Sequence, residues 1–256
     1  MRPELEVDKI TLSFGGLKVL NEVSLSVAAG ELLALIGPNG AGKTSIFNCI
    51  SGIYRPTGNI RFRGSDILGK RPNHVAALGI ARTFQHGELF PHMNVIDNLL
   101  TGRHTLMSTG PLAEMLCLPN VRRAEREHRE AVDRIIHFVE LDRFRHTPLG
   151  DLPFGMQKIV GFARALAAEP ALLLLDEPSA GLTRDEREDL AYFIMKTKDE
   201  LGIGMIWIEH DMQMVADLAC RVHVLDYGRS LADGPPEEVL KNKAVIEAYL
   251  GTVAEG

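Results

Sequence analysis

The fold is decided by the stretch Glu31-Leu32-Leu33-Ala34-Leu35-Ile36, which runs directly into Gly37-Pro38-Asn39-Gly40-Ala41-Gly42-Lys43-Thr44. The first part is an almost continuous apolar run, which is typical of a central parallel strand covered on both faces. The second part matches the pattern G-x-x-x-x-G-K-[ST]. The segment Ser45–Ile50 has helical character and stops at Gly52. A strand, a glycine-rich loop and a helix in this order predict an α/β fold.

The glycine-rich loop predicts a phosphate site. Glycines let the backbone wrap tightly, so that successive N–H groups point at a β-phosphate. The following helix adds its positive N-terminal end. Lys43 would bring a charge to the β- and γ-phosphates, and Thr44 a hydroxyl to Mg²⁺. A chance glycine turn is the alternative, and the flanking strand and helix argue against it. The candidate nucleotide-binding residues are Gly37, Pro38, Asn39, Gly40, Ala41, Gly42, Lys43, Thr44 and Ser45.

A second apolar strand, Leu172–Leu175, ends in two acids, Asp176 and Glu177. In P-loop ATPases an acid at this place holds Mg²⁺, and Asp176 fits that role. Glu177 lies where the chain leaves the sheet and could orient the attacking water. One acid at a strand end is often only a helix cap or a solvated turn. Two adjacent acids can divide metal holding from water activation, a division that one carboxylate could not make.

A third apolar strand, Met205–Ile208, is followed by Glu209 and His210. A single histidine is more often structural than catalytic. However, ligands of α/β sheets bind beyond the carboxyl ends of the strands. This placement favours contact between His210 and a γ-phosphate.

Further elements surround this core. Thr183 and Glu186 fit a capping box that opens a helix toward Lys198. Helical spacing of apolar residues over Val121–Val139 indicates a helix within a middle segment of different character. Alternating apolar and polar residues predict short strands at Ile10–Phe14, Val23–Val27 and Ile60–Phe62.

The composition excludes several classes of protein. The chain has 256 residues with 28 Lys+Arg against 34 Asp+Glu, a formal net charge of −6. This balance argues against a protein that coats nucleic acid. The three cysteines are too few and too widely spaced for a disulfide framework or a zinc knuckle. The first residues lack the apolar core of a signal peptide, and no apolar run approaches the length of a membrane span. We therefore expect a cytoplasmic protein.

Together these motifs resemble those of one family, the ATPase subunits of ABC transporters. Gln85 lies where the family carries its Q-loop glutamine, and Ser179–Leu182 resembles the D-loop. Phe14 lies where the family stacks an aromatic ring on adenine. The resemblance implies ATP and Mg²⁺ as cofactors, with Thr44, Gln85 and Asp176 at the metal. It also implies that Glu177, His210 and Lys43 are catalytic.

The resemblance also implies the architecture. The expected fold is an α/β P-loop NTPase with a RecA-like parallel core, an N-terminal antiparallel β-subdomain and an inserted α-helical subdomain. Residues 1–256 would form a single nucleotide-binding domain. The helical subdomain would span about 91–165 and include the signature segment.

The signature segment departs from the family pattern Leu-Ser-Gly-Gly-Gln. Here it is Leu152-Pro153-Phe154-Gly155-Met156, followed by Gln157. Pro153 replaces the serine that meets the γ-phosphate across a dimer, and it removes a backbone donor. In one interpretation, Gly155, Gln157 and the helix start still bind nucleotide in trans, with activity lowered. In the other, the site is impaired and the chain is a regulatory nucleotide binder. The first is favoured, because a backbone-and-dipole anion site does not need the hydroxyl.

Several stretches narrow the resemblance to the ATPase of bacterial branched-chain (hydrophobic) amino-acid uptake systems. They are Gly79–Gln85, Leu89–Pro91, Met93–Leu99, Gly102–His104 and Val245–Gly251. The resemblance implies an ATPase homo- or heterodimer, integral-membrane permease subunits and, indirectly, a substrate-binding protein. It places the chain peripherally at the cytoplasmic face of the inner membrane, without a nucleic-acid partner. A soluble ABC ATPase that acts on nucleic acid is the alternative.

The same branch suggests where a permease docks. We expect this surface near Gln85–Val95, with Leu89, Phe90 and Met93 as apolar anchors. Packing of these three side chains in the core is the alternative.

Overall fold

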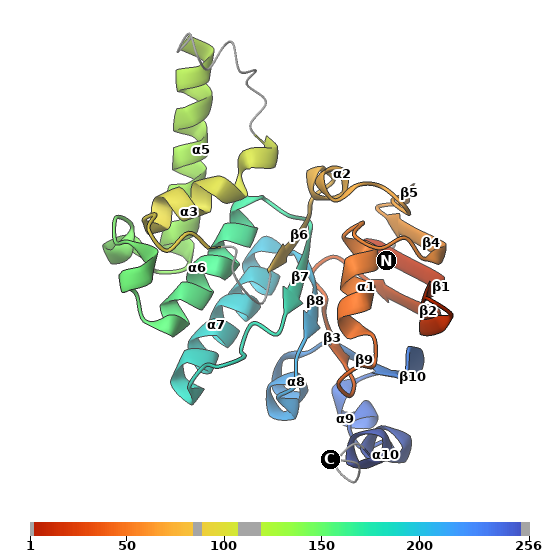
Figure 1. Cartoon of the computed structure of the whole chain (residues 1–256). Coiled ribbons are helices and arrows are strands. Elements are labelled where there is room, and N and C mark those ends of the chain that lie inside the picture. Colours follow the sequence, from red (N-terminus) through yellow and green to blue (C-terminus); the bar gives the residue numbers. More distant parts are fainter. Residues whose placement is uncertain (1–2, 84–88, 107–118, 252–256) are drawn as a thin grey trace.

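The computed structural model describes residues 3–83, 89–106 and 119–251, and Figure 1 shows how their elements are arranged. Over these ranges the chain forms two β-sheets and a group of helices. The antiparallel sheet lies to the right of the parallel-rich sheet in this view, and α3, α5 and α6 lie to its left. Within the described ranges, no helix is both long enough and apolar enough to cross a bilayer.

The N-terminal sheet is antiparallel, with the strand order β2-β1-β4-β5. Gly15 and Gly16, both with positive φ, make the turn between its first two strands. This sheet confirms the expected antiparallel β-subdomain. Its strands are β1 (Leu5–Phe14), β2 (Leu17–Val27), β4 (Thr57–Phe62) and β5 (Ser65–Asp66).

The second sheet has the strand order β10-β9-β3-β8-β7-β6. All neighbours from β9 to β6 pair in parallel, and β10 pairs with β9 in the antiparallel sense. This is the parallel core that the sequence predicted, with the expected strand β3 inside it. The strands are β3 (Leu32–Ile36), β6 (Ile80–Thr83), β7 (Leu172–Asp176), β8 (Gly204–Ile208), β9 (Arg221–Asp226) and β10 (Arg229–Gly234).

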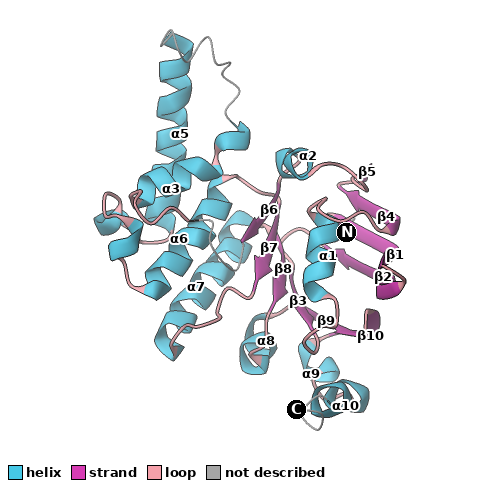
Figure 2. Cartoon of the chain, viewed as in Figure 1, coloured by secondary structure: helices cyan, strands magenta, loops and turns pink. Residues whose placement is uncertain are grey.

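Helices cover the parallel-rich sheet (Figure 2). The expected helical insert consists of α3 (Val95–Gly102), α5 (Pro119–Phe138) and α6 (Phe154–Ala167), with the short 3-10 helices η1 (His104–Leu106), η2 (Asp142–Phe144) and η3 (Leu149–Asp151). The other helices of the described residues are α1 (Lys43–Ile50), α2 (Pro72–Ala77), α7 (Arg184–Leu201), α8 (Met212–Leu218), α9 (Pro236–Val239) and α10 (Lys243–Gly251). The predicted capping box at the start of α7 is present, with both of its hydrogen bonds.

The central strands are buried on both faces, because alternate residues enter different cores. In β7, Leu172 and Leu174 pack with α1 and the antiparallel sheet, whereas Leu173 and Leu175 pack with the helical insert. Each leucine is fully buried, and burial of one such side chain stabilises the fold by about 1.5–3 kcal/mol. A hydrophobic run without alternation is therefore what this position in the sheet requires.

The topology brings three loops to one edge of the sheet. Since β3, β7 and β8 are parallel, the residues that follow them lie at a common carboxyl edge. These residues are the glycine-rich loop, the acids at 176–177 and His210.

Candidate active site

The glycine-rich loop has a backbone shape that needs glycine. Gly37 has φ 149°, and a Cβ there would lie 2.1 Å from the carbonyl oxygen of Leu225. Gly42 has φ 105°, and a Cβ there would lie 2.8 Å from a methyl group of Leu20. The loop therefore wraps closely against β2 and β9 before α1 begins at Lys43.

The Lys43 side chain lies inside this loop. Its Nζ donates to the carbonyl oxygens of Gly37, at 2.6 Å, and Pro38, at 2.9 Å. The residue is only 6% exposed. Burial lowers the pKa of Lys43, while the nearby carboxylates of Glu177 and Asp176 act to raise it. An ammonium enclosed by main-chain groups at a helix start suits an incoming phosphate.

The other loop residues differ in exposure. Asn39, Gly40 and Thr44 are exposed, and Ser45 is half-buried. The Thr44 hydroxyl is therefore accessible to a ligand bound at this edge.

The carboxylate of Asp176 is buried at the end of β7. Its Oδ2 accepts from Arg82 Nη2 at 2.6 Å, and its Oδ1 has no hydrogen-bond partner in the described part of the chain. Burial raises the pKa of Asp176, and the hydrogen bond from Arg82 opposes that change. Carboxylate and hydroxyl oxygens are ligands that Mg²⁺ accepts. The oxygen atoms at this site thus suit Mg²⁺, and Asp176 and Thr44 could hold the ion.

The sequence alone did not indicate the role of Arg82. This arginine also donates to Asn48 Oδ1 at 2.7 Å and lies 5.4 Å from the centre of the Phe47 ring. It therefore ties β6 to α1 and β7. No local sequence pattern predicts the contact between Arg82 and Asp176, because the two residues are far apart in the sequence.

Glu177 and His210 form a contact between two neighbouring strand ends, which the sequence had placed at one edge of the sheet. His210 Nε2 lies 2.9 Å from Glu177 Oε1. Glu177 has φ 47°, an uncommon conformation for a residue with a side chain. Its N–H donates to the carbonyl oxygen of Ile208 at 3.1 Å, which helps to hold this shape. A carboxylate paired with an imidazole can accept a proton from a bound water.

Ser179 and Glu209 form a second contact between the same two loops. Ser179 Oγ donates to Glu209 Oε2 at 2.5 Å, and both residues are buried. The other oxygen of Glu209 accepts from the N–H groups of His210 and Asp211. Glu209 therefore links the predicted D-loop to the segment that carries His210, a link that sequence analysis did not identify.

The signature segment begins α6. Pro153 is the N-cap and makes no side-chain cap hydrogen bond. The N–H of Gly155 donates to Glu186 Oε1 at 3.1 Å. Gln157 Nε2 donates to the carbonyl oxygen of Leu152 at 2.8 Å. Both predicted trans contacts are thus engaged within their own chain.

Two further site predictions, Phe14 and Gln85, remain predictions. Phe14 is 47% exposed at the end of β1 and packs edge-on against Tyr54, with ring centroids 5.1 Å apart. Gln85 lies outside the described residues. The structure therefore brings together Lys43, Asp176, Glu177 and His210.

Comparison with known proteins agrees with this geometry. The family model described as ABC transporter matches residues 20–180. The chain belongs to the ABC transporter family. A second model, described as branched-chain amino acid ATP-binding cassette transporter, matches residues 229–255.

Full-length relatives of this ABC ATPase have closely related names. The chain is 41% identical over 251 residues to the high-affinity branched-chain amino acid transport ATP-binding protein BraF of Pseudomonas aeruginosa, covering 98% of both chains. It is 39% identical over 254 residues to LivG of Escherichia coli, again covering 98% of both. Among solved structures, the ADP conformation of MJ1267, an ATP-binding cassette of an ABC transporter, superposes with a TM-score of 0.86. It shares 31% identity, with 98% of this chain and 100% of that chain covered. The alternative that involves nucleic acid gains no support from these relatives.

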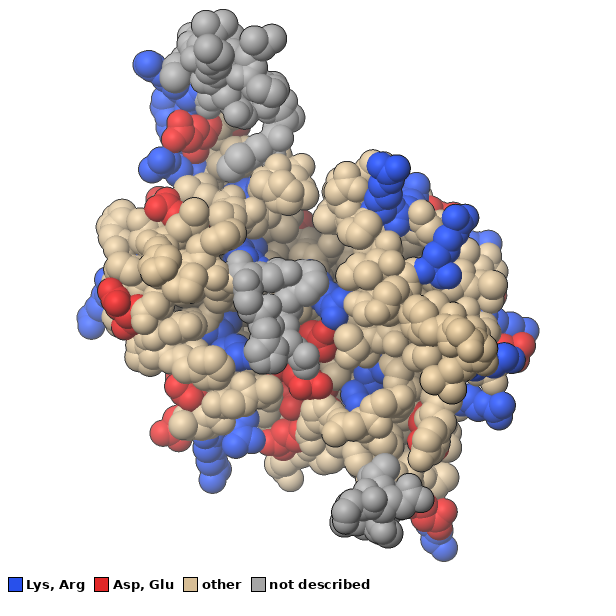
Figure 3. Space-filling model, viewed as in Figure 1, with Lys and Arg blue, Asp and Glu red and all other residues tan. Residues whose placement is uncertain are grey.

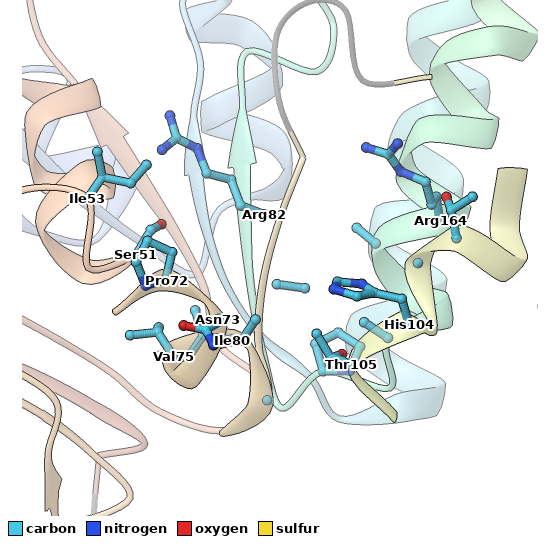
Figure 4. A pocket seen from close by; sticks show the side chains of 18 of the residues that line it. Ser51, Ile53, Pro72, Asn73, Val75, Ile80, Arg82, His104, Thr105 and Arg164 are labelled. Carbon is cyan, nitrogen blue, oxygen red and sulfur yellow. The ribbon is translucent and has the colours of Figure 1, made fainter. Parts of the chain in front are cut away.

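The ABC ATPase also has a cavity of about 670 Å³ between its core and the helical insert. Figure 4 shows Pro72 and Val75 on the core side and His104 and Arg164 on the insert side. Phe90 also lines the cavity and is 47% exposed. Acidic and basic side chains are interspersed over the surrounding face of the molecule (Figure 3).

The three expected docking anchors differ from one another. Phe90 and Met93 are exposed, at 47% and 41%. Leu89 is half-buried and packs against the core of the helical insert. The alternative of core packing therefore holds for Leu89.

The C-terminal helix α10 of the ABC ATPase contacts the first residue of the glycine-rich loop. The ring of Tyr249 in α10 packs against the core of β3 and β9, and its hydroxyl contacts the backbone of Gly37. Burial raises the pKa of Tyr249 to about 12, and the Gly37 contact acts against that change. The part of the chain that matches the branched-chain model thus supports the first residue of the loop.

Proposed function

We propose that this ABC ATPase hydrolyses ATP to drive the import of branched-chain amino acids. The observation that carries this proposal is the 41% identity to BraF over 98% of both chains, together with the C-terminal match at 229–255. The ATPase is the part of such a system that does not touch the solute. The assignment of the solute therefore rests on the relatives, and the assignment of the chemistry rests on the site.

The site residues divide the chemistry of hydrolysis among them. The loop amides and Lys43 hold the β- and γ-phosphates and offset their charge. Thr44, Asp176 and Gln85 would hold Mg²⁺, which supplies further positive charge at the phosphates. Glu177 orients a water and accepts its proton, while His210 fixes the Glu177 carboxylate and meets the γ-phosphate. Phe14 stacks on the adenine ring.

Two ATPase subunits complete each site. In a head-to-tail dimer, ATP on one glycine-rich loop would meet Gly155 and Gln157 of the facing subunit. Such bridging contacts exist only in the closed arrangement, so ATP shifts the equilibrium toward it. Hydrolysis removes the bridge, and the pair opens. The second subunit is either another copy of this chain or a close paralogue.

A permease subunit docks on the cavity between the core and the helical insert. The exposed Phe90 supplies an apolar anchor at this cavity, and Met93 supplies a second one nearby. Strand β6 forms part of the cavity wall and leads into the segment with Gln85, so the metal site and the docking surface are adjacent in the chain. The chain is then peripheral at the cytoplasmic face of the membrane, and a substrate-binding protein acts on it only through the permease.

Uptake measurements test the proposal. Deletion of the gene should lower uptake of radiolabelled leucine, isoleucine and valine in the parent organism. The intact gene should restore uptake, and a Glu177→Gln gene expressed to the same level should not. Sulfate uptake serves as the control, because a sulfate/thiosulfate import ATP-binding protein is a 33% identical relative. Normal uptake of all three amino acids in the deletion strain would refute the assigned solute.

A further inference from the structure

Glu186 occupies the N-terminal end of the signature helix. Its Oε1 accepts from the Gly155 N–H at 3.1 Å. A Cβ at Gly155 would lie 2.5 Å from that oxygen and 2.6 Å from the carboxylate carbon. Gly155 is therefore the residue that lets this carboxylate approach the helix so closely.

The contact is separate from the capping box of α7. That box uses Glu186 Oε2, which accepts from the Thr183 N–H and Oγ at 2.9 Å each. The capping box leaves Oε1 available to a second helix. The pKa of Glu186 is lowered chiefly by Thr183 and also by the Gly155 N–H, so the carboxylate is an anion at neutral pH. One side chain thus serves the first turns of both α6 and α7.

The signature helix has no cap of its own. Its N-cap is Pro153, which has no side-chain acceptor. The first amide groups of a helix need acceptors from outside, and its positive end favours an anion. Glu186 meets both needs at Gly155.

We propose that Glu186 is a positioning residue that competes in cis with the γ-phosphate for the Gly155 N–H. This inference rests on the proposed head-to-tail dimer, in which the same N–H faces the ATP of the other subunit. One amide hydrogen cannot serve two anions at full strength, and two anions at one helix end repel each other. Closure of the dimer therefore requires the Glu186 carboxylate to leave Gly155. ADP lacks the phosphate that would replace it.

The location of Glu186 extends the effect to the D-loop. Thr183 directly follows the predicted D-loop, Ser179–Leu182, and shares the carboxylate with Gly155. Phe154 also lies against this loop, because a Cβ on Gly181 would be 3.2 Å from its ring. Movement of Glu186 would thus loosen the start of α7 as α6 takes up phosphate.

The test compares Glu186→Gln with Glu188→Gln, both in the full chain with Glu177→Gln to slow hydrolysis. Glu188 is an exposed glutamate on the same helix that pairs with Arg184, so its change removes the same charge without touching α6. The dimer dissociation constant is measured in MgATP by sedimentation. We expect Glu186→Gln to tighten the dimer about 3- to 10-fold, as for removal of a competing charge at a helix end. Glu188→Gln should leave it unchanged.

Two further measurements separate competition from capping. Thr183→Ala damages the same cap but retains the carboxylate, so the dimer should not tighten. The Gly155 amide resonance of the chain without nucleotide should shift in Glu186→Gln and stay in place in Glu188→Gln. Melting curves record whether each variant is folded, and the resonance shift needs no dimer.

The outcomes distinguish this inference from the proposed function. If Glu186→Gln dimerises as Glu188→Gln does, or more weakly, Glu186 is only a helix cap and the inference is wrong. An unshifted Gly155 resonance also overturns it. If the Glu177→Gln parent dimerises in MgATP neither with itself nor with its paralogue, the head-to-tail function fails, and the inference fails with it.

Discussion

Replacement of Arg82 by methionine would leave Asp176 as a buried charge without its partner. The two side chains form a 2.6 Å ion pair in which Arg82 is 8% and Asp176 2% exposed. The variant also removes the hydrogen bond to Asn48 and the contact over the Phe47 ring. Methionine retains most of the apolar length of the arginine stem, so the change is mainly electrostatic.

The expected loss of stability is large. Removal of one partner from a buried ion pair costs about 3–5 kcal/mol, because the remaining charge stays in a poorly solvated place. For a chain of this size, about 2–4 °C of melting temperature is lost per kcal/mol. The Arg82→Met variant should therefore melt about 6–20 °C below the wild type at neutral pH.

The loss of stability in Arg82→Met should become smaller at acidic pH. The pKa of Asp176 is raised by burial, and the hydrogen bond and charge of Arg82 are the strongest opposing influences. Without Arg82 the folded-state pKa rises further. When the pKa of a carboxyl group is higher in the folded state than in the unfolded state, its charged form destabilises the folded state. Protonation of the carboxylate removes this destabilisation as the pH falls through the folded-state pKa. The difference in stability between variant and wild type is therefore full above the folded-state pKa of Asp176 in the variant. It shrinks as the pH falls from that value toward the folded-state pKa of Asp176 in the wild type.

Urea unfolding at several pH values measures the effect. Arg184→Met is the control, since Arg184 and Glu188 form a largely exposed pair on α7, and this variant should unfold like the wild type. The double variant Arg82→Met, Asp176→Asn removes both charges and should recover most of the loss. A single variant as stable as the control, or a double variant no more stable than the single one, would refute the electrostatic account.

Three other expectations concern catalysis and the loop. Glu177→Gln should bind ATP with unchanged affinity in calorimetry but release phosphate about 10²- to 10⁴-fold more slowly, as for loss of a general base. Pro153→Ser should raise the steady-state ATPase rate or leave it unchanged, and a large fall would show that the proline is adapted to this site. Gly37→Ala should lower both the melting temperature and the ATP affinity, because its Cβ would meet the Leu225 carbonyl at 2.1 Å in a φ of 149°. Wild-type values for Gly37→Ala would show that the loop can relax.

The parts of the site that the sequence predicted follow from sheet geometry. Parallel strands place their carboxyl ends at one edge, so residues after β3, β7 and β8 must come together. The apolar runs identified these strands because both of their faces are buried. The order of the strands alone therefore predicts that Lys43, the two acids and His210 lie at one edge of the sheet.

The parts that were missed depend on tertiary partners. Strand β6, Ile80–Thr83, is short and lacks a clear pattern, and its identity as a strand comes from its parallel pairing with β7. The role of Arg82 depends on its ion pair with Asp176, and the helical insert separates these two residues in the sequence. The Thr183–Glu186 capping box was visible because its members are three residues apart. The contact of Glu186 with Gly155 was not, because it joins two helices.

The pairings within this structure also explain why closure should depend on the nucleotide. Four groups of the predicted site already have partners inside the chain: Lys43 with Gly37 and Pro38, Asp176 with Arg82, Glu177 with His210, and Gly155 with Glu186. A ligand gains affinity only by the difference between its contacts and those it replaces. An uncharged ligand would exchange one hydrogen bond for another of similar strength. A polyphosphate brings several charges to the loop and, in the proposed dimer, one more to the facing helix. The internal pairings therefore favour the open arrangement until a triphosphate is present, and loss of its terminal phosphate returns Gly155 to Glu186.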